Sequence, residues 1–232
     1  MSLFVGANFS QAAISAGIYA GIASGVAISC LYAALALGPI SIVSPLTAVI
    51  SAVIPVIFDL ATGAKLGPFA LIAIGLVLVA VVLVAFVPGR DFRLPSLRAL
   101  LYSVGAGVGF AGIFVFLDGA PSDSGLATLV VMRVVGITLM LAGLTYAFFK
   151  YRPKQFLETS IFGRSLIWLV LLAGSGDVFG NVFFLVATRA GELAIAAVLT
   201  SLYPVGTILL ARIVLKERIA KSQSLGIVLA IG

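Results

Sequence analysis

The feature that most constrains this chain is a series of long apolar segments that contain almost no charge. About 20 such residues cross the hydrocarbon core of a bilayer. Because backbone polar groups in lipid must be satisfied within the chain, each segment is predicted to be a membrane-spanning helix. The eight segments cover residues 11–37, 39–60, 66–87, 97–118, 125–149, 164–188, 192–214 and a stretch that begins near residue 222.

The composition supports an all-α integral membrane protein and excludes several kinds of chemistry. Hydrophobic residues make up 62% of the 232 residues and charged residues 9%, whereas soluble domains contain about 25% charged residues. The chain has no histidine, and Cys30 is its only cysteine, so histidine-based catalysis and an intrachain disulfide are excluded. It also lacks a GxxxxGK[ST] nucleotide-binding motif. We therefore expect no enzyme activity, no catalytic residue, no metal site and no cofactor.

The first three segments correspond to the last three at an offset of 153 residues. Gly38 corresponds to Gly191, and Thr47 corresponds to Thr200. The order of helix, turn, helix, charged turn and helix also matches without a gap. Since the first segment corresponds to the sixth, five helices later, the two copies would cross the membrane in opposite senses. Such an inverted repeat is common in secondary transporters.

The repeat predicts how the chain divides. Residues 1–87 form a partial first repeat, and residues 97–232 form a second repeat. The second copy begins with two helices that have no counterpart before residue 11, so we expect two helices to be missing there. The last segment has about 11 residues before Gly232, which cover roughly half a bilayer at about 1.5 Å per residue. We therefore expect a truncated last helix and about eight of ten membrane helices.

Small residues recur at every fourth position in three of the segments. This spacing places them on one helix face and lets a second backbone approach closely. Tight helix packing is the favoured interpretation, and direct substrate contact is the alternative. The residues are Ala13, Gly17, Gly21, Gly25, Ser29 and Ala33 in the first segment, Gly105 and Gly109 in the fourth, and Gly176 and Gly180 in the sixth.

Four short stretches of the second half form a recognisable pattern: Gly176-Asp177, the run from Asn181 to Gly191, Leu199-Thr200-Ser201-Leu202-Tyr203-Pro204 and Leu215-Lys216-Glu217-Arg218-Ile219. This pattern resembles the drug/metabolite transporter superfamily and its EamA-like family. A weaker counterpart ends in Gly63-Ala64-Lys65-Leu66, where the family usually has Gly-Glu-Arg-Leu. The resemblance implies ten helices in two inverted five-helix repeats and transport of amino acids, other metabolites or drugs through a central cavity.

The distribution of basic residues bears on membrane orientation. The connections after the third, fifth and seventh segments hold ten Lys and Arg residues, and the connections on the opposite side hold only Lys65 and Arg189. This bias places the ten-residue side in the cytoplasm. The usual topology of the resembled family, with both termini inside, would place the same connections outside. The two indications oppose each other, and the sequence allows both orientations.

Two charged residues lie inside apolar segments. Asp177 is near the middle of the segment 164–188, and Arg133 lies eight residues into the segment 125–149. A charge at this depth costs about 2.5–3.5 kcal/mol, so such residues usually face a cavity or one another. We expect the two to pair, either as a structural ion pair or as a site for a substrate amine or a coupling proton. Asn181, one turn after Asp177, is expected to share its face.

Further candidate site residues flank prolines inside the segments. Pro45, Pro55 and Pro204 each remove a backbone hydrogen bond and are expected to kink their helices. The polar neighbours are predicted to line the cavity or to hydrogen-bond between helices, and they are Ser44, Thr47, Thr200, Ser201 and Tyr203. Glu192 is expected to cap the helix that follows it, and Arg212 to reach the interface from the end of its segment.

We therefore predict a secondary transporter in the plasma or inner membrane that exports a small metabolite or drug by exchange or proton coupling. Its partners are the bilayer and a small-molecule substrate, with a homodimer as one option for assembly and no nucleic acid. The main alternative is a membrane scaffold without transport. A second alternative is an intramembrane aspartyl protease, because Gly174-Ser175-Gly176-Asp177 spells the GxGD motif. That chemistry needs a second carboxylate at the site, and no matching aspartate motif follows.

Overall fold

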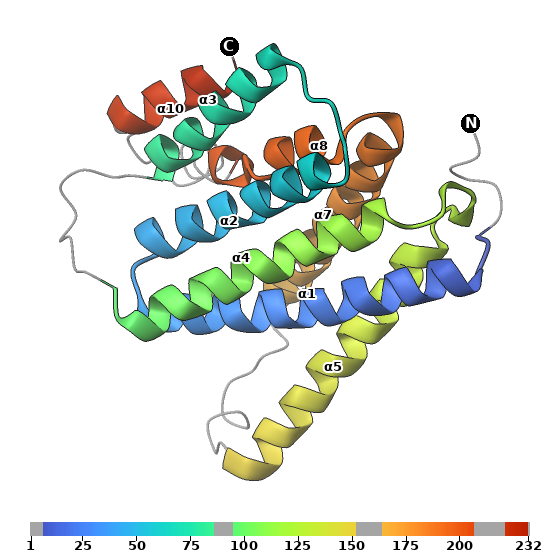
Figure 1. Ribbon diagram of the computed structural model, residues 1–232. Coiled ribbons are helices and arrows are strands. Elements are labelled where there is room, and N and C mark those ends of the chain that lie inside the picture. The colour runs from blue at the N-terminus through green and yellow to red at the C-terminus, as the bar shows by residue number, and fades with distance from the viewer. Residues whose placement is uncertain (1–6, 86–94, 152–163, 207–220, 232) are drawn as a thin grey trace.

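The computed structural model describes residues 7–85, 95–151, 164–206 and 221–231, and these residues are helical apart from short connections (Figure 1). Five of the helices are long and apolar enough to cross a membrane: α1, α2, α4, α5 and α7. The predicted all-α polytopic membrane fold is therefore confirmed. The elements are α1 (Gln11–Leu37), α2 (Ile40–Ala61), α3 (Pro68–Ala85), α4 (Leu97–Asp118), the 3-10 helix η1 (Ser122–Ser124), α5 (Ala127–Tyr151), α7 (Arg164–Ala190), α8 (Leu193–Thr200) and α10 (Lys221–Ile231).

Local backbone chemistry explains where the helices begin. Ser10 and Ser96 each accept a hydrogen bond from a backbone N–H in the first turn of α1 and α4, as serine does at helix starts. The segment predicted to begin at residue 125 begins at Ala127, because η1 precedes it and Gly125 turns the chain with a φ of 56°. Positive φ is readily adopted by glycine. The helix predicted from residue 66 begins at Pro68, which has no N–H to lose at that position.

The helix predicted over residues 192–214 is interrupted. α8 ends at Thr200, a turn occupies Ser201 and Leu202, and helical geometry resumes at Tyr203. Pro204 accounts for the break because it cannot donate a hydrogen bond to the preceding turn. The remainder of this prediction, including Arg212, lies outside the described residues. By contrast, α2 runs unbroken from Ile40 to Ala61 with Pro45 and Pro55 inside it.

The small-residue face of α1 packs against α5 and α4. A Cβ added at Gly21 would lie 2.7 Å from the Cβ of Val135 in α5, and one added at Gly109 of α4 would lie 2.7 Å from the backbone N of Ala27. Backbones at this distance leave room only for hydrogen. Tight packing, the favoured interpretation of this pattern, is therefore confirmed for α1 and α4. The equivalent positions of α7, Gly176 and Gly180, have no described atom within 4 Å of such a Cβ.

Contacts between the described residues define two ends of the bundle. We call the first the carboxylate end; it contains residues 8–10, 59–63, 118–125 and 189–193, which include Asp59, Asp118, Asp123 and Glu192. The opposite end, which we call the basic end, contains residues 37–44 and 95–99 together with the final residues of α5. α1 begins at the carboxylate end and α7 finishes there, so these two helices run in opposite directions, as an inverted repeat requires.

α2 and α8 also run in opposite directions, and two hydrogen bonds join α2 to α8 and to the residues that follow it. The last turn of α2 reaches the start of α8 through Asp59 and Ala194. Near the other end of α2, the carbonyl of Ser44 accepts a hydrogen bond from the Tyr203 hydroxyl at 3.1 Å. α3 packs beside α10 on the outer side of this pair (Figure 1). α2 therefore lies between α4, α3 and α8, and both α2 and α8 contribute to the cavity described next.

Candidate functional site

A cavity of about 360 Å³ lies among the membrane-spanning helices, near their middle. Its lining is mostly apolar and comes from α1, α2, α4, α5, α7 and the residues from Thr200 to Tyr203. Small-molecule sites are typically apolar hollows with a few placed polar groups, and this cavity has that character. The lining residues are Ser24, Ile28, Leu31, Ser51, Phe110, Ile113, Phe114, Met132, Arg133, Asp177, Gly180, Asn181, Phe184, Thr200, Ser201 and Tyr203.

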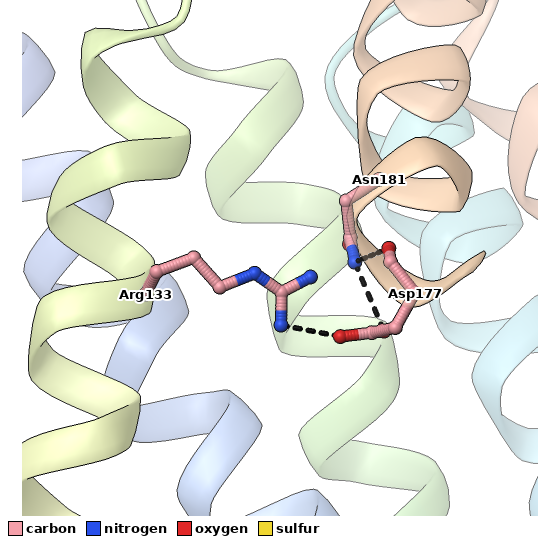
Figure 2. Close-up of polar contacts among 3 residues, drawn as sticks. All are labelled: Arg133, Asp177 and Asn181. Atoms are coloured by element: carbon pink, nitrogen blue, oxygen red, sulfur yellow. Dashed lines mark hydrogen bonds and ion pairs between the residues drawn. The ribbon is translucent and has the colours of Figure 1, made fainter. Parts of the chain in front are cut away.

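An ion pair crosses the cavity wall between α5 and α7. The guanidinium Nη1 of Arg133 contacts Oδ2 of Asp177, so the pair expected from the sequence is present (Figure 2). The side chain of Arg133 is 29% exposed and that of Asp177 is 56% exposed. Both groups therefore reach the open space of the cavity as well as each other.

Asn181 completes a three-residue polar group on the same wall. Its side-chain amide donates to the backbone carbonyl of Asp177 at 2.8 Å and to Oδ1 of the same residue at 3.3 Å (Figure 2). The one-turn spacing that predicted a shared face is therefore confirmed. Because Arg133 contacts Oδ2 and Asn181 contacts Oδ1, the carboxylate is held from both sides in one orientation.

Arg133 also presents a nitrogen with no partner in the part of the chain that the structure describes. Its Nη2 is buried and donates to no acceptor among the described residues. A buried donor without a partner is costly, and in native proteins it usually marks a place where a ligand or water binds. The guanidinium therefore has Nη1 paired with Asp177 and Nη2 buried without a partner among the described residues.

The residues around the break before Pro204 supply the opposite wall. Thr200 and Ser201 line the cavity, but their hydroxyls donate to backbone carbonyls within α8, at 2.7 Å each. Tyr203 lines the cavity and donates to the Ser44 carbonyl. Six of the eight predicted site residues therefore line one cavity: Arg133, Asp177, Asn181, Thr200, Ser201 and Tyr203.

The other two predicted residues, Ser44 and Thr47, lie outside this lining. Thr47 is fully buried and donates to the carbonyl of Ser103 in α4 at 3.3 Å. This contact is the interhelical hydrogen bond that was the alternative interpretation. Ser44 contacts a lining residue through its backbone carbonyl, which accepts a hydrogen bond from the hydroxyl of Tyr203.

The aromatic lining was not predicted from the sequence. Phe114 and Phe184 stack with ring centroids 4.5 Å apart, and Phe110 and Met132 lie beside them on the wall. Nothing distinguishes these residues from the many other apolar residues of a membrane helix, because their role depends on which face meets the cavity. Ser24 on α1 and Ser51 on α2 were also missed, because their presence in the lining likewise depends on which helix face meets the cavity.

An apolar cluster separates the cavity from the carboxylate end. Helices α1, α4, α5, α7 and α8 all contribute to it, and its central members are fully or almost fully buried. It contains Ala20, Ile113, Phe114, Leu117, Leu129, Met132, Phe184, Leu185, Leu193, Ala196 and Ala197. The cavity is therefore closed on that side.

The start of α8 is held by a residue from another helix. Glu192 occupies the N-cap position of α8, as expected, but its side chain makes no capping hydrogen bond. Asp59 of α2 supplies the cap instead, because its Oδ2 accepts from the N–H of Ala194 at 2.8 Å. Asp59 therefore binds the start of α8 and does not approach Asp177. Among the described lining residues, Asp177 is the one carboxylate. Within the described ranges no group of three or more potential metal-ligating side chains occurs.

Comparison with known proteins places these features in a family. The family model described as the EamA-like transporter family matches residues 97–232, which is more than half of the chain. One solved structure, titled "Crystal structure of protein", has a TM-score of 0.66 and 18% sequence identity, and the match covers all of this chain and 88% of the other. At that identity the likeness concerns the fold alone. No curated protein matches the sequence.

Proposed function

Because the chain belongs to the EamA-like transporter family, we propose that it forms the solute path of a secondary transporter in the plasma or inner membrane. The observation that carries this proposal is the polar group of Arg133, Asp177 and Asn181 in a mostly apolar cavity among the membrane helices. Charges at this depth are costly and usually mark the path of a substrate or ion. The inverted directions of α1 and α7 support the same proposal.

The proposed solute is a small zwitterion with an apolar body, such as an amino acid or a related compound. Nη2 of Arg133 has no partner among the described residues, and a guanidinium that turns this nitrogen toward the cavity suits a carboxylate. Oδ1 of Asp177 has a 3.3 Å contact with Asn181, which leaves it able to accept from an ammonium group. A zwitterion would match both residues and leave the net charge of the cavity unchanged, while Phe110 and Phe184 would contact its apolar part.

Export by exchange or by proton coupling completes the proposal, with Asp177 as the coupling residue. A carboxylate that alternates between a guanidinium, a substrate ammonium and a proton links the binding of one to the release of another. The scaffold alternative gains no support from the cavity, because a purely structural subunit has no need of a charged group facing an open space.

The test is flux in vesicles that contain the purified chain. Each vesicle set is loaded with one labelled compound: an apolar amino acid, the amine that lacks its carboxyl group, or the acid that lacks its amino group. We expect protein-dependent efflux of the amino acid, and at least tenfold slower efflux of the two single-charge compounds. Asp177→Asn should abolish the component that an uncoupler removes.

The matched control is Asp123→Asn, which removes a carboxylate that binds Asn8 outside the cavity. This variant should keep the flux of the unchanged chain. Efflux that survives both the uncoupler and Asp177→Asn would retain the carrier and remove the coupling role of Asp177. A correctly folded chain that moves none of the compounds would contradict the proposal and favour the scaffold alternative.

A further inference from the structure

The cap of α8 comes from another part of the chain. Ala194 is the second residue of α8, where backbone N–H groups have no acceptor within the helix. The acceptor is Oδ2 of Asp59, in the last turn of α2, at 2.8 Å. Since Glu192 makes no side-chain capping bond, α8 depends on α2 for the group that most helices supply from their own N-cap residue.

This contact is electrostatic as well as a hydrogen bond. The start of a helix carries a partial positive charge that attracts a carboxylate. The contact is partly buried, so water screens it less than it would screen an exposed pair. It therefore favours conformations in which the end of α2 lies against the start of α8, and it is lost when these two ends separate.

The residues on either side of Ala194 in α8 belong to the apolar cluster that covers the cavity. Leu193 and Ala197 belong to the apolar cluster between the cavity and the carboxylate end, while Ala194 itself packs with Ala52 of α2 and Ile74 of α3. These residues are almost completely buried. Because they belong to the same short helix as Ala194, separation of α8 from α2 at this end would also expose the cluster.

A second charged contact at the carboxylate end differs in what it joins. Nη2 of Arg189 in α7 donates to Ser124 Oγ and the Gly125 carbonyl, at 3.1 Å each, and to the Pro121 carbonyl at 3.4 Å. All of these residues lie within 97–232, the segment that matches the family model. Arg189 therefore stabilises that segment internally, whereas Asp59 joins it to the residues before it.

We propose that Asp59 is a latch that holds the carboxylate end of the cavity closed by capping α8, and that it must release α8 for the cavity to open at that end. A movement of α8 away from the end of α2 breaks the Asp59 contact, whereas the Arg189 contacts join α7 to the residues before α5 and do not involve α2. The latch goes beyond the proposed transport of a solute, and its test needs no solute.

The test measures how often the closed end opens. Cys30 is replaced by alanine, and Ala197→Cys is introduced as a probe, since Ala197 is fully buried in the sealing cluster. The rate of labelling by a water-soluble maleimide is then measured on the full chain in nanodiscs. Loss of a capping residue shifts such an equilibrium by about 2- to 30-fold. We therefore expect Asp59→Ala to raise the labelling rate by that factor and Asp59→Asn, which keeps an acceptor oxygen, to raise it less.

The matched control is Glu192→Gln, which removes a charge from the same helix start. Glu192 moves with α8, so its interaction with that helix is the same in the closed and open forms, and the labelling rate should not change. A second probe, Ala48→Cys, is placed at a fully buried position of α2 outside the apolar cluster and reports general loosening.

Three results would overturn the latch. The first is an unchanged labelling rate at Ala197→Cys in both Asp59 variants. The second is a rise in the labelling rate in Glu192→Gln as large as that in Asp59→Ala. The third is a rise shared by Ala48→Cys, because it would show that Asp59 stabilises the whole fold instead of one end. If Asp59→Ala does not fold, Asp59→Asn with the same two probes decides between these results.

Discussion

At the scale of single residues, the character of the cavity depends on two charges of opposite sign. Arg133 and Asp177 come from different helices and contact each other at the cavity wall. Each charge alone would be costly at this depth, and together they bring a neutral but strongly polar group into an apolar space. Asn181 fixes the carboxylate in place, and Nη2 of Arg133 is buried without a partner among the described residues.

The pair should be detectable as an energetic coupling. Arg133→Gln and Asp177→Asn each leave the other charge without its partner, whereas the double variant leaves neither. We expect the sum of the unfolding free energies lost in the two single variants to exceed the loss in the double variant by about 1 kcal/mol. This is the lower part of the usual range because Asp177 is more than half exposed. Denaturant titration of the four proteins in detergent measures the coupling, and strictly additive losses would contradict it.

At the scale of elements, the small residues of α1 and α4 determine how closely the helices approach. A Cβ at Gly109 would meet three atoms of Ala27 within 2.8 Å, two of them backbone atoms. Backbone atoms cannot move aside as a flexible side chain can, so α4 would have to shift away from α1. That shift would also move Phe110 and Phe114, which lie on the cavity wall.

We therefore expect Gly109→Ala to destabilise the chain by about 1–3 kcal/mol, the usual cost of overpacking. Gly75→Ala in α3 is the matched control, because no described atom lies within 4 Å of its added Cβ. It should cause no loss, since alanine favours a helix more than glycine does. Thermal unfolding midpoints in detergent compare the two, and equal midpoints would show that the α1–α4 contact tolerates a methyl group.

At the scale of the whole molecule, the two ends differ in charge. The carboxylate end contains four acidic residues together with Arg189, and by sequence ten basic residues lie between the third and fourth, fifth and sixth, and seventh and eighth apolar segments. A bias of this size usually sets membrane orientation. Because Asp59 closes the carboxylate end, orientation also determines which compartment the closed side of the cavity faces.

Single cysteines at the two ends should report opposite sides of the membrane. In a Cys30→Ala background, we expect an impermeant maleimide on intact cells to label Lys65→Cys and to reach Lys150→Cys only after permeabilisation. Both positions are exposed, and the replacements leave the charge bias in place. The reverse labelling pattern would contradict the charge rule for this chain and favour the usual topology of the family. Labelling of both from one side would contradict the arrangement of the ends.

The sequence by itself determined the membrane fold, most helix boundaries and the pairing of Arg133 with Asp177. These follow from strong local rules: apolar runs must be helical in lipid, and isolated charges at membrane depth need partners. Only the tertiary structure decided that Asp59 caps α8 in place of Glu192, that Thr47 bonds to α4, and that Phe114 and Phe184 meet at the cavity. In apolar helices many faces are chemically alike, so which face meets the cavity depends on how the helices pack, and no local pattern encodes a contact between residues 135 positions apart.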